Sequence, residues 1–181
     1  MKVFLLSGKA SSGKDLLGKY IKEEFDSKKE NACILRLTAP LYEYAKNYFS
    51  WDGNLEEKPR EFFQEMGIEI IKNKLGKKYF LVNRLCEDID ILKNFFDVFI
   101  ITDGRLIEEF LELKRRIPDI KIIHIIRENY DNHLSEKEKN HITETDLDNY
   151  KYYDYTIYNT SKKKLKEEAV KIVRDSEGEL I

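Results

Sequence analysis

A phosphate-binding pattern stands near the amino terminus. Gly8 and Gly13 are separated by four residues and Lys14 follows at once, the Gly-x-x-x-x-Gly-Lys spacing of a P-loop. Glycines there let backbone N–H groups turn inward around phosphate oxygens, with the positive end of a following helix behind them. Lys14 would reach the β- and γ-phosphates of a nucleotide. The alternative is a glycine-bearing strand-to-helix turn with an exposed lysine. We expect the phosphates to be held by Gly8, Lys9, Ala10, Ser11, Ser12, Gly13, Lys14 and Asp15.

Asp15 occupies the position at which a P-loop usually carries serine or threonine. The usual hydroxyl binds Mg²⁺, and a carboxylate oxygen is also a good ligand for that ion. Asp15 would then be a metal-linked carboxylate in an intact nucleotide site. In the second interpretation, Asp15 is an acid in the first turn of a helix, where it complements the helix dipole. The sequence leaves both interpretations open.

Two further charged groups follow predicted strands. Asp103-Gly104-Arg105 ends one apolar run, and Arg127 follows the next. The carboxyl ends of parallel strands face the same crevice, so these side chains should open toward the P-loop. Asp103 could hold Mg²⁺ through water, Arg105 could bind a second phosphate group, and Arg127 could flank the nucleotide. Each is also explained by an ordinary turn or a charged strand end.

A second group of polar residues lies in the middle of the chain. Arg60 and Gln64 are one helical turn apart, and Gly67 follows them. A guanidinium and an amide on one helix face suit an incoming phosphate and base, and Gly67 would allow close approach. The same face could simply be solvated. Thr38 is expected to line the crevice as well, unless it only caps the next helix.

The elements that position these residues alternate along the chain. Short apolar runs predict strands, and helix-length segments with 3.6-residue periodicity separate them. This alternation predicts an α/β fold, a parallel five-stranded sheet covered by helices on both faces. The strands are expected at residues 2–7, 33–37, 97–103, 121–126 and 153–159.

Two segments interrupt the alternation. Between Trp51 and Lys93 the pattern is helical only, and Pro59 is expected to open a helix there whose inner face includes Phe63 and Ile71. Residues 128–149 are highly charged and poor in aliphatic side chains, so we expect a mobile lid that adds little to a core. The 181 residues therefore predict a single domain, 1–181, with a helical insertion at about 41–93 and a lid at about 128–149.

Composition limits the classes of partner. The 32 Lys and Arg residues nearly balance 34 Asp and Glu residues, so no strong overall field favours nucleic acid or an anionic membrane. Small-molecule nucleotides are the expected partners, and the chain is expected to be a monomer or homodimer. Cys33 and Cys86 lie in apolar stretches and are expected to be reduced thiols in a cytoplasmic protein.

Six motifs follow one another along the chain: SGKASSGKD, KPREFFQEMGIEII, TDGR, IIR, LSEKE and YDYTIYNTSKKKLKEEAVKIV. Their order resembles the deoxynucleoside monophosphate kinase family of P-loop kinases over nearly the whole chain. In that family an aspartate directly after the P-loop lysine is usual. The resemblance implies that Lys14 assists phosphoryl transfer, that Asp103 and Arg105 match the acidic and the basic residue at the third core strand, and that Arg127 flanks the donor site. Arg60 and Gln64 match the acceptor-binding helix.

The expected function is ATP- and Mg²⁺-dependent phosphorylation of a (deoxy)nucleoside monophosphate to the diphosphate. Two alternatives stay open at this point. One is a P-loop kinase with a non-nucleotide acceptor such as phosphomevalonate or dephospho-coenzyme A. The other is an ATP-binding protein without catalysis, because the lid contains no arginine and only Lys137 and Lys139 as cations.

Overall fold

The computed structural model describes residues 1–54, 59–128, 130 and 134–178. Part of the predicted insertion, residues 55–58, and part of the predicted lid, residues 129 and 131–133, lie outside the described residues. None of the helices in the described ranges combines the length and apolar character needed to cross a lipid bilayer.

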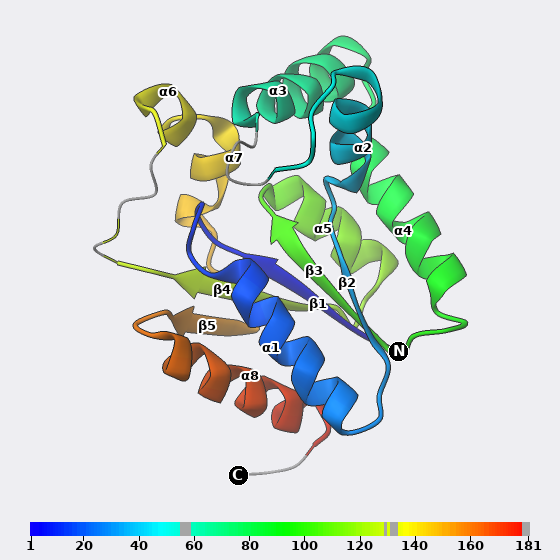
Figure 1. The fold of residues 1–181 in the computed structure, drawn as a ribbon, viewed down its shortest axis with the longest axis vertical. Coiled ribbons are helices and arrows are strands. Elements are labelled where there is room, and N and C mark those ends of the chain that lie inside the picture. Colours follow the sequence, from blue (N-terminus) through cyan, green and yellow to red (C-terminus); the bar gives the residue numbers. More distant parts are fainter. Residues whose placement is uncertain (55–58, 129, 131–133, 179–181) are drawn as a thin grey trace.

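Five parallel strands form a twisted sheet at the centre of the molecule (Figure 1). Their spatial order is β2-β3-β1-β4-β5, so the first strand of the chain is the middle one. At its carboxyl end, Ser7 is in register with Gly104 on one side and His124 on the other. This register brings the ends of three strands together beside the P-loop. The strands are β1 (Lys2–Ser7), β2 (Ala32–Leu35), β3 (Val98–Gly104), β4 (Lys121–Ile126) and β5 (Tyr155–Tyr158).

Helices cover both faces of the sheet, as the alternation predicted, and further helices extend beyond the carboxyl ends of the strands (Figure 1). The bounds are α1 (Lys14–Ser27), α2 (Ala39–Tyr48), α3 (Arg60–Gln64), the π-helix η1 (Glu65–Lys74), α4 (Phe80–Leu92), α5 (Ile107–Arg116), α6 (Glu136–Lys139), α7 (Ile142–Thr145), the 3₁₀ helix η2 (Asp146–Asn149) and α8 (Lys162–Ser176).

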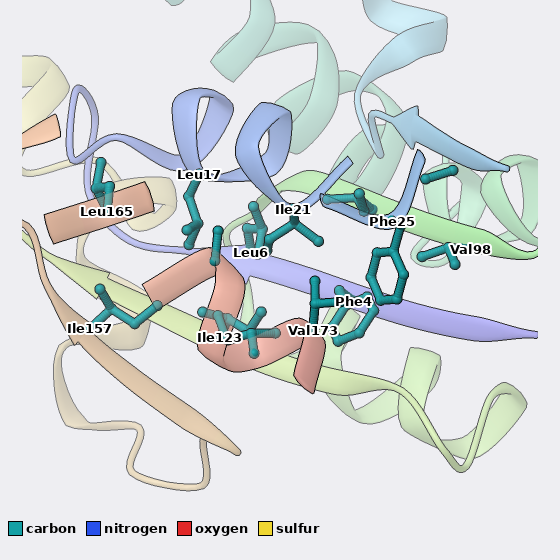
Figure 2. Packing of buried hydrophobic residues seen from close by; sticks show 14 of the residues in the cluster. Phe4, Leu6, Leu17, Ile21, Phe25, Val98, Ile123, Ile157, Leu165 and Val173 are labelled. Atoms are coloured by element: carbon teal, nitrogen blue, oxygen red, sulfur yellow. The ribbon is translucent and has the colours of Figure 1, made fainter. Parts of the chain in front are cut away.

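One hydrophobic cluster fills the space between the sheet and the helices α1 and α8. Leu17 and Ile21 of α1 and Val173 of α8 meet Phe4 of β1 there, and all four are almost completely buried (Figure 2). Side chains alternate across a strand, so the neighbours of Phe4 in β1 point to the opposite face. This packing holds the first turn of α1, and with it the P-loop, against the sheet.

A second cluster lies on the other face of the sheet. It joins buried residues of α4 and α5, such as Leu85 and Phe110, to Leu5 of β1 and Phe99 of β3. Side chains of α2, α3 and η1 form a third, smaller cluster around Leu41, Ala45, Phe63 and Ile71. These three helices therefore have a small core of their own.

Two expectations about local structure differ from what is observed. The helix that opens after Pro59 is regular only to Gln64 and continues as a π-helix, in a segment that combines Gly67 with β-branched isoleucines of low helix preference. The charged lid segment also contributes to the core, because Leu134 is buried and Leu147 packs against the second cluster. Two isolated aliphatic residues were enough to anchor a segment whose average composition is polar.

Candidate active site

The P-loop connects β1 to α1 and has the backbone conformation that its glycines permit. Gly8 and Gly13 have φ of 139° and 107°, in the region that favours glycine. A Cβ on Gly8 would lie 2.4 Å from the carbonyl oxygen of Ile125, and one on Gly13 would lie 2.6 Å from Nδ2 of Asn159. The two glycines are thus required by close contacts with the ends of β4 and β5.

Lys14 begins α1 and turns its side chain into the curve of this loop. Its Nζ donates hydrogen bonds to the carbonyl oxygens of Gly8 at 2.8 Å and Lys9 at 2.7 Å, and the residue is only 7% exposed. Burial, together with the positive charge of Arg105, lowers the pKa of Lys14 well below its usual value, against the opposing effect of nearby carboxylates. A buried ammonium with a destabilised charge is suited to receive a polyanion.

Asp15 is exposed beside the loop, and it has two partners. Its Oδ1 accepts hydrogen bonds from Nη2 of Arg36 at 2.9 Å and from Oγ1 of Thr102 at 3.1 Å. The Arg36 guanidinium also lies over the ring of Tyr42, with 5.4 Å between Cζ and the ring centroid. Asp15 therefore links the first turn of α1 to β3 and to the turn after β2.

Asp103 ties the end of β3 to the turn before α2. One carboxylate oxygen accepts from the Leu37 N–H at 2.7 Å, and the other accepts from the Thr38 N–H at 3.0 Å and from the Thr38 hydroxyl. Thr38 precedes α2, but its hydroxyl makes no capping hydrogen bond to that helix. Thr38 and Asp103 thus meet at the crevice, through contacts that fix both side chains.

Arg105 is held by a carboxylate that the sequence did not single out. Its Nη1 forms an ion pair with Glu144 of α7, and it donates a longer hydrogen bond, 3.4 Å, to the carbonyl oxygen of Thr143. The other Glu144 oxygen accepts from the backbone N–H of Ala10 at 3.0 Å. A single buried carboxylate therefore bridges the P-loop and the arginine that follows β3.

The residues predicted to bind the acceptor line cavities that Arg105 also lines. Arg60 and Gln64 border a cavity of about 90 Å³ together with Thr38 and Arg105. Gly67 borders a neighbouring cavity with Thr38, Asp103 and Arg105, and a Cβ on Gly67 would lie 3.3 Å from Leu41 Cδ1. The close approach at Gly67 is thus to helix α2. Gln64 also donates a hydrogen bond to Oγ1 of Thr143 at 3.4 Å, so α3 and α7 lie beside each other (Figure 1).

A larger cavity of about 410 Å³ opens beside the P-loop and the end of β4. Arg127 and Tyr130 line it after β4, and their side chains contact each other, with 4.9 Å between the guanidinium carbon and the ring centroid. Arg127 donates to the carbonyl oxygen of Ser11 at 3.1 Å. Ser12 also lines this cavity, and its Oγ is buried without a hydrogen-bond partner in the described part of the chain.

Several residues that contact the P-loop were missed in the sequence, among them Arg36, Tyr130, Glu144 and Asn159. Asn159 follows β5 directly, and its Nδ2 donates to the carbonyl oxygen of Ser12 at 2.7 Å. The rule that strand ends face one crevice could have identified Asn159. Glu144 has no such signal, because it is one of many acidic residues in a charged segment.

The carboxylates suit an ion shared with phosphate. Among the described residues, no three His, Cys, Asp or Glu side chains gather as a metal site. Mg²⁺ in phosphoryl-transfer sites commonly takes only one or two carboxylates, and its other ligands are water and phosphate. Asp15 fits this pattern, since 68% of its side chain is exposed at the P-loop. Asp103 is already engaged by Leu37 and Thr38, which fits contact through water better than direct coordination.

Comparison with solved structures identifies the fold. The chain superposes on a shikimate kinase from Bacteroides thetaiotaomicron with a TM-score of 0.51 and 14% identity, covering 98% of both chains. A gluconokinase from Sinorhizobium meliloti 1021 gives a TM-score of 0.51 and 12% identity, covering 97% of this chain and 93% of that one. A dephospho-CoA kinase from Campylobacter jejuni gives 0.49 and 18%, covering 96% of each. At these identities the first two matches show the fold alone, and it is the fold of P-loop kinases.

Sequence comparison gives a family. No curated protein sequence matches the chain significantly. The sequence model of the family described as deoxynucleotide monophosphate kinase matches residues 43–169, well over half of the 181 residues. That segment begins after the P-loop and includes Arg60, Arg105, Arg127 and Glu144. Together with the P-loop kinase fold, this match shows that the chain is a phosphotransferase and belongs to the deoxynucleotide monophosphate kinase family.

Proposed function

We propose that this kinase transfers the γ-phosphoryl group of ATP to the phosphate of a nucleoside monophosphate, with a deoxynucleotide as the preferred acceptor. One observation carries the proposal. The buried Lys14 ammonium lies inside the P-loop, and the Arg105 guanidinium pairs with Glu144, whose other oxygen accepts from the Ala10 N–H of the loop. Lys14 and Arg105 are close enough for their charges to interact, and two neighbouring cations suit a group passing between two phosphates.

On the donor side, the P-loop residues 8–15 bind the triphosphate of ATP. The cavity of about 410 Å³ next to Gly8, Lys9 and Ser12 accommodates the rest of the ATP molecule, and Arg127 lines this cavity. The unpartnered Ser12 hydroxyl supports this assignment, because a buried polar atom without a partner is costly unless a ligand or water satisfies it.

On the acceptor side, the helical insertion at about 41–93 binds the monophosphate. Arg60, Gln64 and Gly67 come from this insertion, and Thr38 stands at its base. Arg105 contacts the acceptor phosphate, because it lines both of the acceptor-side cavities as well as the donor cavity. In the lid proposed at about 128–149, the described residues Thr143 and Glu144 border the cavities on both sides of the transfer, and we infer that this segment limits access of water to the transferring group.

The chain's own groups act mainly by position and charge. Lys14 and Arg105 neutralise the charge that builds up on the transferring phosphoryl oxygens, and Asp103 fixes the loop that carries Thr38. The acceptor phosphate is already an anionic nucleophile, so no general base is needed. Asp15 would hold Mg²⁺ directly and Asp103 would hold it through water. When bound, the ion supplies further neutralisation of phosphate charge.

An acceptor panel tests this function. Purified protein with ATP and Mg²⁺ is assayed for ADP formation with each deoxynucleoside and ribonucleoside monophosphate, and with phosphomevalonate and dephospho-coenzyme A. We expect ADP formation that depends on a nucleoside monophosphate, with higher kcat/KM for deoxynucleotides. Turnover only with a non-nucleotide acceptor would refute the proposed substrate class. ATP binding without turnover on any acceptor would indicate a binding protein.

A further inference from the structure

The Glu144 carboxylate lies between the P-loop and Arg105. It belongs to the short helix α7, its side chain is only 8% exposed, and its two oxygens face two different parts of the site. One oxygen accepts from the Ala10 N–H of the P-loop at 3.0 Å, and the other pairs with the Arg105 guanidinium. These partners come from sequence positions far apart, so the arrangement exists only in the folded chain.

The partners of Glu144 are those expected for a phosphoryl group. A P-loop N–H and a guanidinium are standard donors to phosphate oxygens, and both form stronger hydrogen bonds to an anion than to a neutral acceptor. The carboxylate is also close enough to Lys14 to act on its charge, where it opposes the effects of burial and of Arg105. The Ala10 N–H, the Arg105 guanidinium and the Lys14 ammonium thus all interact with the Glu144 carboxylate.

Resting on the function proposed above, we propose that Glu144 stands in for the transferring phosphoryl group in the nucleotide-free enzyme. Incoming polyphosphate displaces the carboxylate from the Ala10 N–H and from Arg105, because two anions cannot share these donors. Glu144 therefore competes with ATP, and the affinity measured for ATP is lowered by the fraction of enzyme in which the carboxylate occupies the site.

Neighbouring contacts hold Glu144 in place without filling the phosphate position. Asp148 of η2 forms an ion pair with Lys9 at 2.9 Å, and Asp146 accepts from the Ile107 N–H at 2.7 Å. Both attach α7 and η2 to the rim of the site. Displacement of Glu144 leaves these contacts available, so the exchange needs only a local movement of α7.

Calorimetric titration tests the competition directly. Wild-type enzyme, Glu144→Gln and Glu144→Asp are titrated with ATP and, separately, with inorganic tripolyphosphate, both with Mg²⁺. We expect Glu144→Gln to bind both ligands about tenfold more tightly, since the variant keeps the side-chain shape but loses the charge that competes. Glu144→Asp keeps the charge on an arm too short to reach both partners, so we expect a smaller gain.

Glu136→Gln is the matched control. Glu136 lies in the same lid segment, 81% of its side chain is exposed, and it pairs with Lys139 of its own helix. The substitution makes the same change in net charge away from the P-loop, and we expect wild-type affinity for both ligands. Thermal unfolding of each variant without ligand checks that the fold is retained.

The outcomes separate this inference from the proposed function. If wild-type enzyme binds ATP and Glu144→Gln binds it equally or more weakly, the competition is refuted and the kinase assignment stands. If Glu136→Gln gains as much affinity as Glu144→Gln, the effect is one of general charge and the inference also fails. If no variant, including wild type, binds ATP or tripolyphosphate, both this inference and the proposed function are refuted.

Discussion

Replacing Lys14 with methionine separates its chemical role from its structural one. Methionine keeps a long, unbranched stem in the buried position and removes the ammonium. We expect phosphoryl transfer to fall about 10²- to 10³-fold, the usual effect of removing one preorganised donor to developing charge. We expect the free energy of unfolding, measured without nucleotide, to change by less than about 2 kcal/mol, because two opposing effects nearly cancel.

The near-cancellation follows from the surroundings of Lys14. The variant loses two hydrogen bonds from a charged donor, to the carbonyl oxygens of Gly8 and Lys9, each worth about 1.5–3 kcal/mol. The Lys9 carbonyl still accepts from the Ser12 N–H at 3.2 Å. Against this loss, the variant no longer buries an ammonium that is 7% exposed, and that burial costs several kcal/mol.

Two measurements check the expectation. ADP formation with saturating ATP and acceptor gives the rate, and urea unfolding without nucleotide gives the stability. Lys19→Met is the control, because Lys19 lies on the same helix but its side chain is 66% exposed and pairs with Glu23 of that helix. The reasoning is refuted if Lys14→Met retains turnover within about threefold of wild type, far from the expected loss. A loss of more than about 4 kcal/mol of stability would instead make Lys14 a structural residue.

The remaining predictions concern the acceptor, pH and the core. Arg60→Ala should raise the KM for the acceptor more than that for ATP, and equal increases would contradict the division of the crevice. The affinity for ATP should fall as pH rises through the lowered pKa of Lys14, because phosphate binds the charged form of the side chain. Calorimetry in buffers of different ionisation enthalpy should show that the complex takes up protons on binding ATP at pH values near and above this pKa. Gly104→Ala should lower stability by about 1–3 kcal/mol in urea unfolding, because its Cβ would lie 2.8 Å from Leu5 Cδ1; an unchanged midpoint would contradict this. Burial raises the pKa of Glu109 to about 8, so wild-type stability should fall relative to Glu109→Gln as pH rises from about 4.3, the unfolded value, to about 8. A constant difference between these two proteins across that range would refute the shift.

The fold was predictable because its signals are local. Strands β1, β3 and β4 are buried on both faces, and such strands are continuous apolar runs that are visible in the sequence. The strand order is different, because it depends on which strands pair across the sheet and no single segment encodes it. The π-helix at Glu65–Lys74 was also missed, since its apolar residues fit the spacing of an ordinary helix.

The candidate site was predictable where it follows a backbone rule. Lys14 was found from glycine spacing, and Arg105 and Arg127 were found because each follows a strand. Arg36 and Glu144 were missed, because each acts through a partner that is distant in sequence. Arg36 pairs with Asp15, and Glu144 reaches Ala10 and Arg105 from the lid segment.

The two outermost strands of the sheet are its shortest. β2 and β5 have four residues each, whereas the three inner strands have six or seven. An exposed strand edge offers unpaired N–H and C=O groups to other chains, and a short edge offers few of them. The enzyme thus presents little template for intermolecular β-pairing, which should favour solubility at the high concentrations reached during overexpression.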